Sequence, residues 1–234
     1  GIVYHDLMKQ EKIGSIYEID NLQELIKKIE KQFIVSPPPF FVDGKYSFEP
    51  YFKAFLNSYQ PLEDTSLLTT NKCNNNCIHC IHFMELAGSA IKDVPVDSLY
   101  RQIRESHQSK KSHVIFSGGE PTIVAELPKL VQYTCKLGMN PVILSNGRLF
   151  SYPKNIKPFI SSDPLFIIPL HSHIRERHDS ISRVGGSFNQ TRKAIKNLVS
   201  NNLRVMGKTV LIKPNHGDLA GIVRLYQKLG VNVI

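Results

Sequence analysis

Residues 69–80 read Thr69-Thr70-Asn71-Lys72-Cys73-Asn74-Asn75-Asn76-Cys77-Ile78-His79-Cys80. The chain has 234 residues and four cysteines, and three of these lie in this one short stretch. Three neighbouring thiols cannot all pair among themselves as disulfides, and a chain of this length can bury a core without disulfide bonds. In a reducing compartment, thiols gathered in this way indicate a metal or redox site.

The composition indicates where the protein works and what it binds. The chain begins Gly1-Ile2-Val3-Tyr4, which lacks the basic and then apolar run of a secretory signal. No stretch reaches the ~18 apolar residues of a membrane span, so we expect a cytoplasmic protein without a membrane partner. The net charge of +9 favours an anionic partner. Because the basic residues are scattered, we expect a solvated basic surface in preference to a nucleic-acid-binding one.

The first 60 residues differ from the rest. Asp20 can cap a helix whose apolar residues recur from Leu22 to Phe33, and Pro37-Pro38-Pro39 prevents its continuation. Aromatic residues gather between positions 46 and 59. We interpret residues 1–60 as a small N-terminal appendage of unknown role and residues 61–234 as the main domain.

In the main domain, short apolar runs alternate with amphipathic stretches. Helical periodicity leads from Leu127 to a stop at Gly138, recurs around residues 194–199, and runs from Leu219, with Asp218 as its cap, to Gly230. Strands are predicted at residues 66–70, 113–117, 141–145, 165–170 and 205–212, with another starting at 231. This alternation predicts parallel strands joined by crossovers, and hence an α/β sheet or barrel.

Every unusual motif follows a predicted strand. In chain order these are the cysteine stretch, Gly118-Gly119-Glu120-Pro121-Thr122, Ser145-Asn146-Gly147-Arg148 and His171-Ser172. Because the carboxyl ends of parallel strands meet at one edge of a sheet, we expect the four motifs to lie together there.

These residues resemble the radical S-adenosylmethionine (SAM) superfamily. Its cluster motif has three cysteines separated by three and two residues, with an aromatic residue before the last, as in Cys73, Cys77, His79 and Cys80. The Gly-Gly-Glu-Pro loop matches a second hallmark, and residues 178–188 are similar to the peptide- and protein-modifying branch. The resemblance implies a partial (β/α)6 TIM-like barrel, truncated at its C-terminus and without the auxiliary-cluster domain of many relatives in that branch.

The resemblance also implies cofactors and site residues. Soft thiolates hold a 4Fe-4S cluster, one per iron, so Cys73, Cys77 and Cys80 would leave one iron open for SAM. An external one-electron reductant such as flavodoxin or ferredoxin would drive reductive SAM cleavage to a 5′-deoxyadenosyl radical, which abstracts hydrogen from a peptide or protein. No catalytic residue of the protein is implied. The implied cofactor contacts are His79, Gly118, Gly119, Glu120, Pro121, Ser145, Asn146, Ser172 and Arg183.

Several residues allow a second interpretation. Cys73, Cys77, Cys80 and His82 could form a structural zinc site in a non-catalytic module that binds RNA. A radical SAM enzyme acting on a small molecule or RNA is a further alternative. Ser-Asn-Gly is also an ordinary turn sequence, His79 could be an exposed loop residue, and Arg183 could be a surface charge.

Overall fold

A computed structural model describes residues 64–80 and 94–231, together with the backbone of four short strands nearer the N-terminus. By their contacts, Gly1–Phe48 and Glu49–Ile234 form two separate units. In the first unit, β1 (Ile2–Tyr4) pairs antiparallel with β2 (Lys12–Ser15), and β3 (Phe41–Val42) pairs antiparallel with β4 (Lys45–Tyr46). The helix expected after Asp20 and the aromatic run lie outside the described residues, so the appendage boundary at residue 60 stays a prediction.

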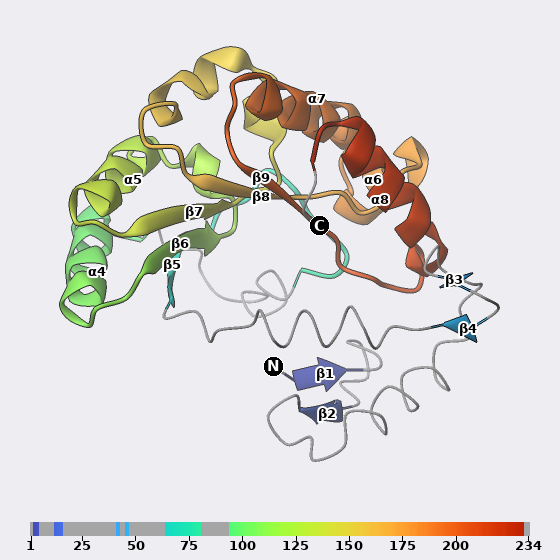
Figure 1. The fold of residues 1–234 in the computed structure, drawn as a ribbon, viewed down its shortest axis with the longest axis horizontal. Helices are drawn as coiled ribbons and strands as arrows, with labels where there is room; N and C mark the ends of the chain where they lie inside the picture. The colour runs from blue at the N-terminus through green and yellow to red at the C-terminus, as the bar shows by residue number, and fades with distance from the viewer. Residues whose placement is uncertain are drawn as a thin grey trace. The chain divides into compact units, whose positions relative to one another are not determined.

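The second unit contains a sheet of five parallel strands in the order β5-β6-β7-β8-β9. Their order in the chain is also their order in the sheet, so each helical connection moves the chain one strand along (Figure 1). This is the architecture of a partial TIM-like barrel, as the sequence predicted. The strands are β5 (Asp64–Thr70), β6 (His113–Gly118), β7 (Asn140–Leu144), β8 (Leu165–Pro169) and β9 (Val205–Lys208).

Amphipathic helices cover the sheet. Figure 1 shows α4 and α5, in green, beside β5 to β7, and α7 and α8, in orange to red, beside β8 and β9. No helix in the described part of the chain is long and apolar enough to cross a membrane. The helices are α4 (Val96–Gln108), α5 (Leu127–Lys136), α6 (Arg175–Ser182), α7 (Ser187–Ser200) and α8 (Leu219–Lys228). The short 3-10 turns are η1 (Pro121–Ile123), η2 (Arg148–Ser151), η3 (Pro153–Asn155), η4 (Lys157–Phe159) and η5 (His216–Asp218).

The core lies between the sheet and these helices. Phe150, Phe159 and Phe166 pack edge to face, with ring centroids 5.1 to 5.9 Å apart, and all three are buried. Such aromatic pairs add about 1 kcal/mol each beyond the area they bury. The cluster anchors the long η2–η4 connection against β8, and so holds the end of β7 in place.

Two expectations about the secondary structure were wrong in detail. β9 ends at Lys208 instead of residue 212. The Asn215 side chain forms hydrogen bonds with backbone groups of residues 210 and 212, which would otherwise have extended the strand. Its amide donates to Val210 O (2.9 Å) and its oxygen accepts the Ile212 N–H (2.7 Å). Asp218 precedes α8 as expected, but its side chain does not cap the helix. The expected sixth strand falls mostly on residues 232–234, outside the described residues.

Candidate cluster and cofactor site

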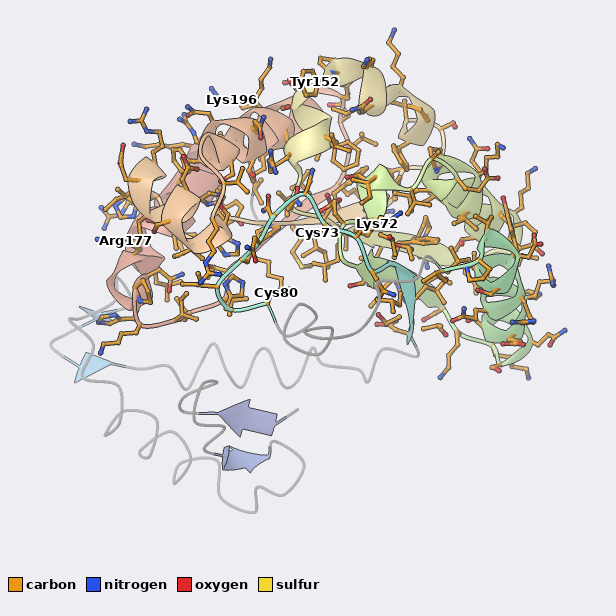
Figure 2. All side chains as sticks on the ribbon, turned by 180° about the vertical axis from the view of Figure 1, so that it is seen from behind. Lys72, Cys73, Cys80, Tyr152, Arg177 and Lys196 are labelled. Atoms are coloured by element: carbon orange, nitrogen blue, oxygen red, sulfur yellow. The ribbon has the colours of Figure 1, made fainter. Side chains whose placement is uncertain are left out.

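The four motifs meet at the carboxyl edge of the sheet, as the parallel strands require. The cysteine loop, residues 71–80, leaves β5 and crosses this edge toward α6. Figure 2 shows Lys72 and Cys73 near the β5 end of the loop and Cys80 further along it, on the side where Arg177 of α6 is labelled. Glu120 follows β6, Ser145 and Asn146 follow β7, and His171 follows β8.

Backbone hydrogen bonds hold the cysteine loop at two places, the end of β6 and the last turn of α6. Each place supplies two bonds, so the loop is fixed on both sides of Cys73. The N–H groups and their acceptors are Gly119 to Thr70 O (2.7 Å), Glu120 to Lys72 O (2.8 Å), Asn76 to Ser182 O (3.1 Å) and Ile78 to Ile181 O (2.9 Å).

Two glycines at the end of β6, Gly118 and Gly119, allow this contact. A Cβ on Gly119 would lie 2.1 Å from the Lys72 carbonyl oxygen, and a Cβ on Gly118 would lie 2.5 Å from that of Thr70. Gly118 also has φ +118°, which side chains rarely adopt. Gly118 and Gly119 therefore let the chain after β6 approach the backbone of Thr70 and Lys72 closely.

Two of the three thiols, Cys73 and Cys77, face amide donors. Asn75 donates its backbone N–H to Cys73 Sγ (3.3 Å) and its Nδ2 to Cys77 Sγ (3.9 Å), while Asn146 Nδ2 lies 4.0 Å from Cys73 Sγ. Burial raises the pKa of Cys73 and raises that of Cys77 to about 11. Both are therefore thiols at neutral pH in the metal-free chain, and metal binding must release their protons.

The donor set fits an open iron–sulfur cube. Within residues 64–80 and 94–231, no three His, Cys, Asp or Glu side chains converge on a position for a single metal ion. A 4Fe-4S cluster does not require its ligands to converge on one point, because each thiolate binds a different iron. His82, the fourth ligand of the zinc alternative, lies outside the described residues.

Glu120 links the cysteine loop to the end of β7. The side chain is 1% exposed. Burial raises its pKa, and the hydrogen bonds that it accepts act in the opposite direction. Its Oε1 accepts Thr122 N (3.1 Å), Thr122 Oγ1 (2.5 Å) and Ser145 Oγ (2.7 Å), and its Oε2 accepts Asn146 N (2.8 Å). Because a carboxylate offers about four acceptor positions, Oε1 is filled and Oε2 keeps room for one donor.

Ser145 and Pro121 support this arrangement. The buried Ser145 hydroxyl donates to Glu120 and accepts the Gly147 N–H (2.9 Å), so both of its roles are used within the chain. Pro121 opens η1, the turn in which the Glu120 side chain accepts the Thr122 N–H. Asn146 differs, because its side-chain amide points toward the cysteine loop.

A row of imidazoles continues the site beyond the thiols. The rings of His79 and His171 lie 4.7 Å apart edge to face, and those of His171 and His178 are stacked at 5.3 Å. Burial lowers the pKa of His171 to about 2 and that of His178 to about 4, so both are neutral at pH 7. The Nδ1 atoms of His79 and His171 are buried without a hydrogen-bond partner. Such atoms are available to a ligand.

Ser172 and Arg183, the last two residues expected at the site, lie in different settings. The Ser172 hydroxyl donates to Asp218 Oδ2 and accepts the Ile174 N–H (2.9 Å), and Arg177 also pairs with Asp218. Arg183 is exposed at the C-terminus of α6 with φ +54°. Its backbone N–H donates to Asp179 O, whereas its guanidinium makes no hydrogen bond or ion pair with any residue in the described ranges.

The family model described as "Radical SAM superfamily" matches residues 67–226. The chain belongs to this superfamily. Radical SAM proteins use a 4Fe-4S cluster and SAM. The donor set of the cysteine loop fits such a cluster with one iron left open for SAM. Arg148 and Asp218 also lie at this edge of the sheet, although the sequence suggested Arg148 only as part of a turn motif and Asp218 only as a helix cap. A signal was present for Arg148, because it directly follows the Ser-Asn-Gly turn.

Individual relatives differ in what they are named for. The chain is 28% identical over 167 residues to Fe-coproporphyrin III synthase of Methanosarcina barkeri, covering 68% of this chain and 39% of that protein. It is 25% identical over 171 residues to the subtilosin biosynthesis protein AlbA of Bacillus subtilis, covering 73% and 38%. The fold is similar to that of Streptococcus suis SuiB bound to its precursor peptide SuiA, with a TM-score of 0.61, 15% identity, and coverage of 94% and 46%. The chain thus spans less than half the length of each of these proteins.

Proposed function

We propose that this chain forms the core of a radical SAM enzyme that cleaves SAM reductively and abstracts hydrogen from a peptide or protein. The observation that carries the proposal is the joining of the cysteine loop to Glu120 and Asn146 by backbone and side-chain hydrogen bonds. These bonds bring a three-thiolate ligand set beside a buried carboxylate with one open acceptor position. An open iron and an anchor for an ammonium group are what SAM requires.

The roles of the residues follow from their positions. Cys73, Cys77 and Cys80 would hold three irons, and Glu120 Oε2 would accept a hydrogen bond from the SAM ammonium. When bound and reduced by one electron, the cofactors supply the 5′-deoxyadenosyl radical. The surrounding protein positions the cofactors and excludes water. A flavodoxin or ferredoxin is proposed as the electron donor.

The remaining contacts are proposed with different roles. His79 would lie beside the adenine, where its partnerless Nδ1 supports a ligand contact. Asn146 remains a direct candidate, because its side chain points toward Cys73. Gly118, Gly119, Pro121 and Ser145 act by shaping the loop around Glu120. Ser172 is engaged by Asp218, and Arg183 would have to turn toward the site, so we rank these two last.

A peptide substrate is favoured over a small molecule by two considerations. SuiB, which has a similar fold, is solved with its precursor peptide bound, and AlbA is named for bacteriocin biosynthesis; both support a peptide substrate here. The net charge of +9 suits an acidic leader sequence. Fe-coproporphyrin III synthase represents the small-molecule alternative. Residues 1–60 are proposed as a separate appendage.

The reaction class can be tested without the substrate. The protein is reconstituted anaerobically with iron and sulfide, reduced with dithionite in the presence of SAM, and assayed for 5′-deoxyadenosine. We expect slow formation that is absent in Cys77→Ala. If the reconstituted protein carries a cluster but forms no 5′-deoxyadenosine, the proposed reaction is wrong.

The substrate class needs a second comparison. The same assay is run with a pool of acidic peptides, with a pool of basic peptides of equal length as the charge control, and with iron coproporphyrin III. We expect the acidic pool to accelerate 5′-deoxyadenosine formation most. Acceleration by the porphyrin alone would favour the small-molecule alternative.

A further inference from the structure

Arg148 connects the cysteine loop to α7. It is the first residue of η2, directly after the turn that ends β7. Its Nη1 donates to the backbone oxygen of Asn74 and to Asn75 Oδ1 (2.9 Å), and its Nε donates to Gln190 Oε1 (2.6 Å). One guanidinium therefore holds two neighbouring loop residues and is itself held by a helix.

Asn146 also holds the cysteine loop through hydrogen bonds. Its Nδ2 donates to Asn74 Oδ1 (2.6 Å), and its Oδ1 accepts the Arg148 backbone N–H (3.0 Å). Asn74 is thus bound through its backbone and its side chain by two residues that are also bound to each other. A loop held at this many points loses less conformational entropy when it binds a ligand.

Held in this way, Asn75 presents its donors to sulfur. Because Arg148 occupies Oδ1, the Nδ2 of the same amide turns toward Cys77 Sγ (3.9 Å), while the Asn75 backbone N–H reaches Cys73 Sγ (3.3 Å). Without Arg148 the amide could rotate, and its oxygen could face the sulfur instead. The residues between Cys73 and Cys77 therefore set the spacing of the two thiols and also supply amide donors to them.

We propose that Arg148 is a positioning residue of the cluster-binding loop, which sets how firmly the cluster is retained and at what potential it is reduced. Hydrogen bonds to the cluster sulfurs and a nearby positive charge both favour the more negative reduced state, so they raise the reduction potential. The proposal rests on the cluster that the family implies. It concerns a residue outside the cysteine and Gly-Gly-Glu-Pro motifs.

The test compares three substitutions in the full chain. Arg148→Met removes the hydrogen bonds and the charge, and Arg148→Lys keeps the charge but cannot span Asn74, Asn75 and Gln190 together. The control is Arg204→Met, which removes the same charge from a half-exposed pair with Asp163 before β9. Cluster loss to an iron chelator is followed by absorbance, and the midpoint potential is measured by a titration monitored by electron paramagnetic resonance.

We expect Arg148→Met to lose its cluster about tenfold faster or more, as for other residues that orient metal ligands. We also expect a more negative potential, with Arg148→Lys between this variant and the parent and Arg204→Met unchanged. Equal loss rates and potentials in Arg148→Met and Arg204→Met would overturn the proposal.

A measurement on metal-free protein separates this proposal from the proposed function. The rate at which a thiol reagent modifies Cys73 and Cys77 reports how firmly the empty loop is held, whatever the reaction of the holoenzyme. We expect modification to be faster in Arg148→Met than in Arg204→Met, and equal rates would contradict the proposal. Should Arg148→Met fail to fold, Gln190→Leu removes only the anchor of the guanidinium, and we expect a smaller increase in both rates.

Discussion

The carboxyl edge of the sheet has two sides that are built differently. On the cysteine side, at the ends of β5 to β7, Asn146 and Arg148 direct amide and guanidinium donors at the loop that carries the thiols. On the histidine side, at the ends of β8 and β9, neutral imidazoles stack and the buried carboxylate of Asp218 ties Ser172 to Arg177. The first side carries the three thiols that we propose as cluster ligands, whereas the second is held mainly by contacts within the chain.

Tyr226 shows how the histidine side is held. Its buried hydroxyl lies between the ends of β8 and β9. Its single hydrogen lies within reach of Ile168 O (2.7 Å) and Lys208 O (2.8 Å), and its oxygen accepts the N–H groups of Leu170 (2.7 Å) and Lys208 (3.1 Å). A side chain at Gly207 would collide with its ring, with contacts near 2.9 Å. A side chain from α8 thus sets the spacing of two strands, whereas the loop on the cysteine side is positioned by backbone hydrogen bonds together with the side chains of Asn146 and Arg148. Changes on the two sides should therefore separate cluster binding from stability.

The largest expected effect is the loss of the cluster. Cys77→Ala leaves two thiolates in the loop, which cannot retain a cube, so we expect iron and sulfide to fall to background after reconstitution. Cys135→Ala is the control, because that thiol lies on α5, outside the cysteine loop, and donates to the Ser162 carbonyl oxygen (3.5 Å). Normal iron content in Cys77→Ala would remove this cysteine from the ligand set.

The next effect tests how closely the Gly-Gly-Glu-Pro loop packs against the cysteine loop. In Gly119→Ala, the new methyl group would lie 2.1 Å from a backbone oxygen, so we expect the free energy of unfolding to fall by about 3 kcal/mol. Gly185→Ala meets nothing within 4 Å, so its stability should change by less than about 1 kcal/mol. Urea unfolding of both metal-free variants makes the comparison. Similar stabilities would show that the two loops separate without cost.

A smaller effect is expected on the histidine side. Tyr226→Phe removes a hydroxyl that satisfies buried backbone groups of both strands, which should lower the free energy of unfolding by about 2 kcal/mol. Cluster content after reconstitution should be unchanged, because the cysteine loop is held elsewhere. Tyr152→Phe is the matched control, since Tyr152 is 52% exposed. Loss of the cluster in Tyr226→Phe would contradict the separation of the two sides.

The smallest effect is a dependence of stability on pH. His178 accepts the His171 backbone N–H at Nδ1 (3.2 Å), and burial lowers its pKa to about 4 from 6.5. Between these two values the unfolded chain binds more protons, so the free energy of unfolding falls as the pH falls, by at most about 1.4 kcal/mol per pH unit. The stability attributed to neutral His178 is therefore complete above pH 6.5.

The comparison for this effect is His178→Gln, which keeps an acceptor that does not titrate in this range. The raised pKa of Glu120 acts with the opposite sign, because the folded chain then binds the extra proton, but it contributes equally to both proteins. Urea unfolding at about pH 7 and about pH 5 should show a shallower dependence in His178→Gln. Equal slopes would mean that His178 does not titrate as a buried group.

Much of this could be predicted from local patterns. The stop of α5 at Gly138 and of α8 at Gly230 was predicted, and both glycines have left-handed φ values of +78° and +83°. The helices α4 and α6 were not predicted. In α6 the polar residues Ser182 and His178 are buried, so hydrophobic periodicity is weak there. Asp218 was interpreted as a helix cap because capping is local, yet its carboxylate is used by Ser172 and Arg177, more than forty residues earlier.

By itself, the sequence determined the fold class and the edge of the sheet at which the three proposed cluster ligands lie. Strand alternation and the spacing of Cys73, Cys77 and Cys80 are local, and parallel strands place their ends together whatever the packing. Tertiary structure decided what surrounds those ligands, including the grip of Arg148 on the loop and the hydroxyl of Tyr226 between two strands. Those contacts join residues tens of positions apart, and only the folded chain brings such donors to their acceptors. The physical reason is that hydrogen-bond geometry is settled to within tenths of an ångström, which no periodicity in the sequence records.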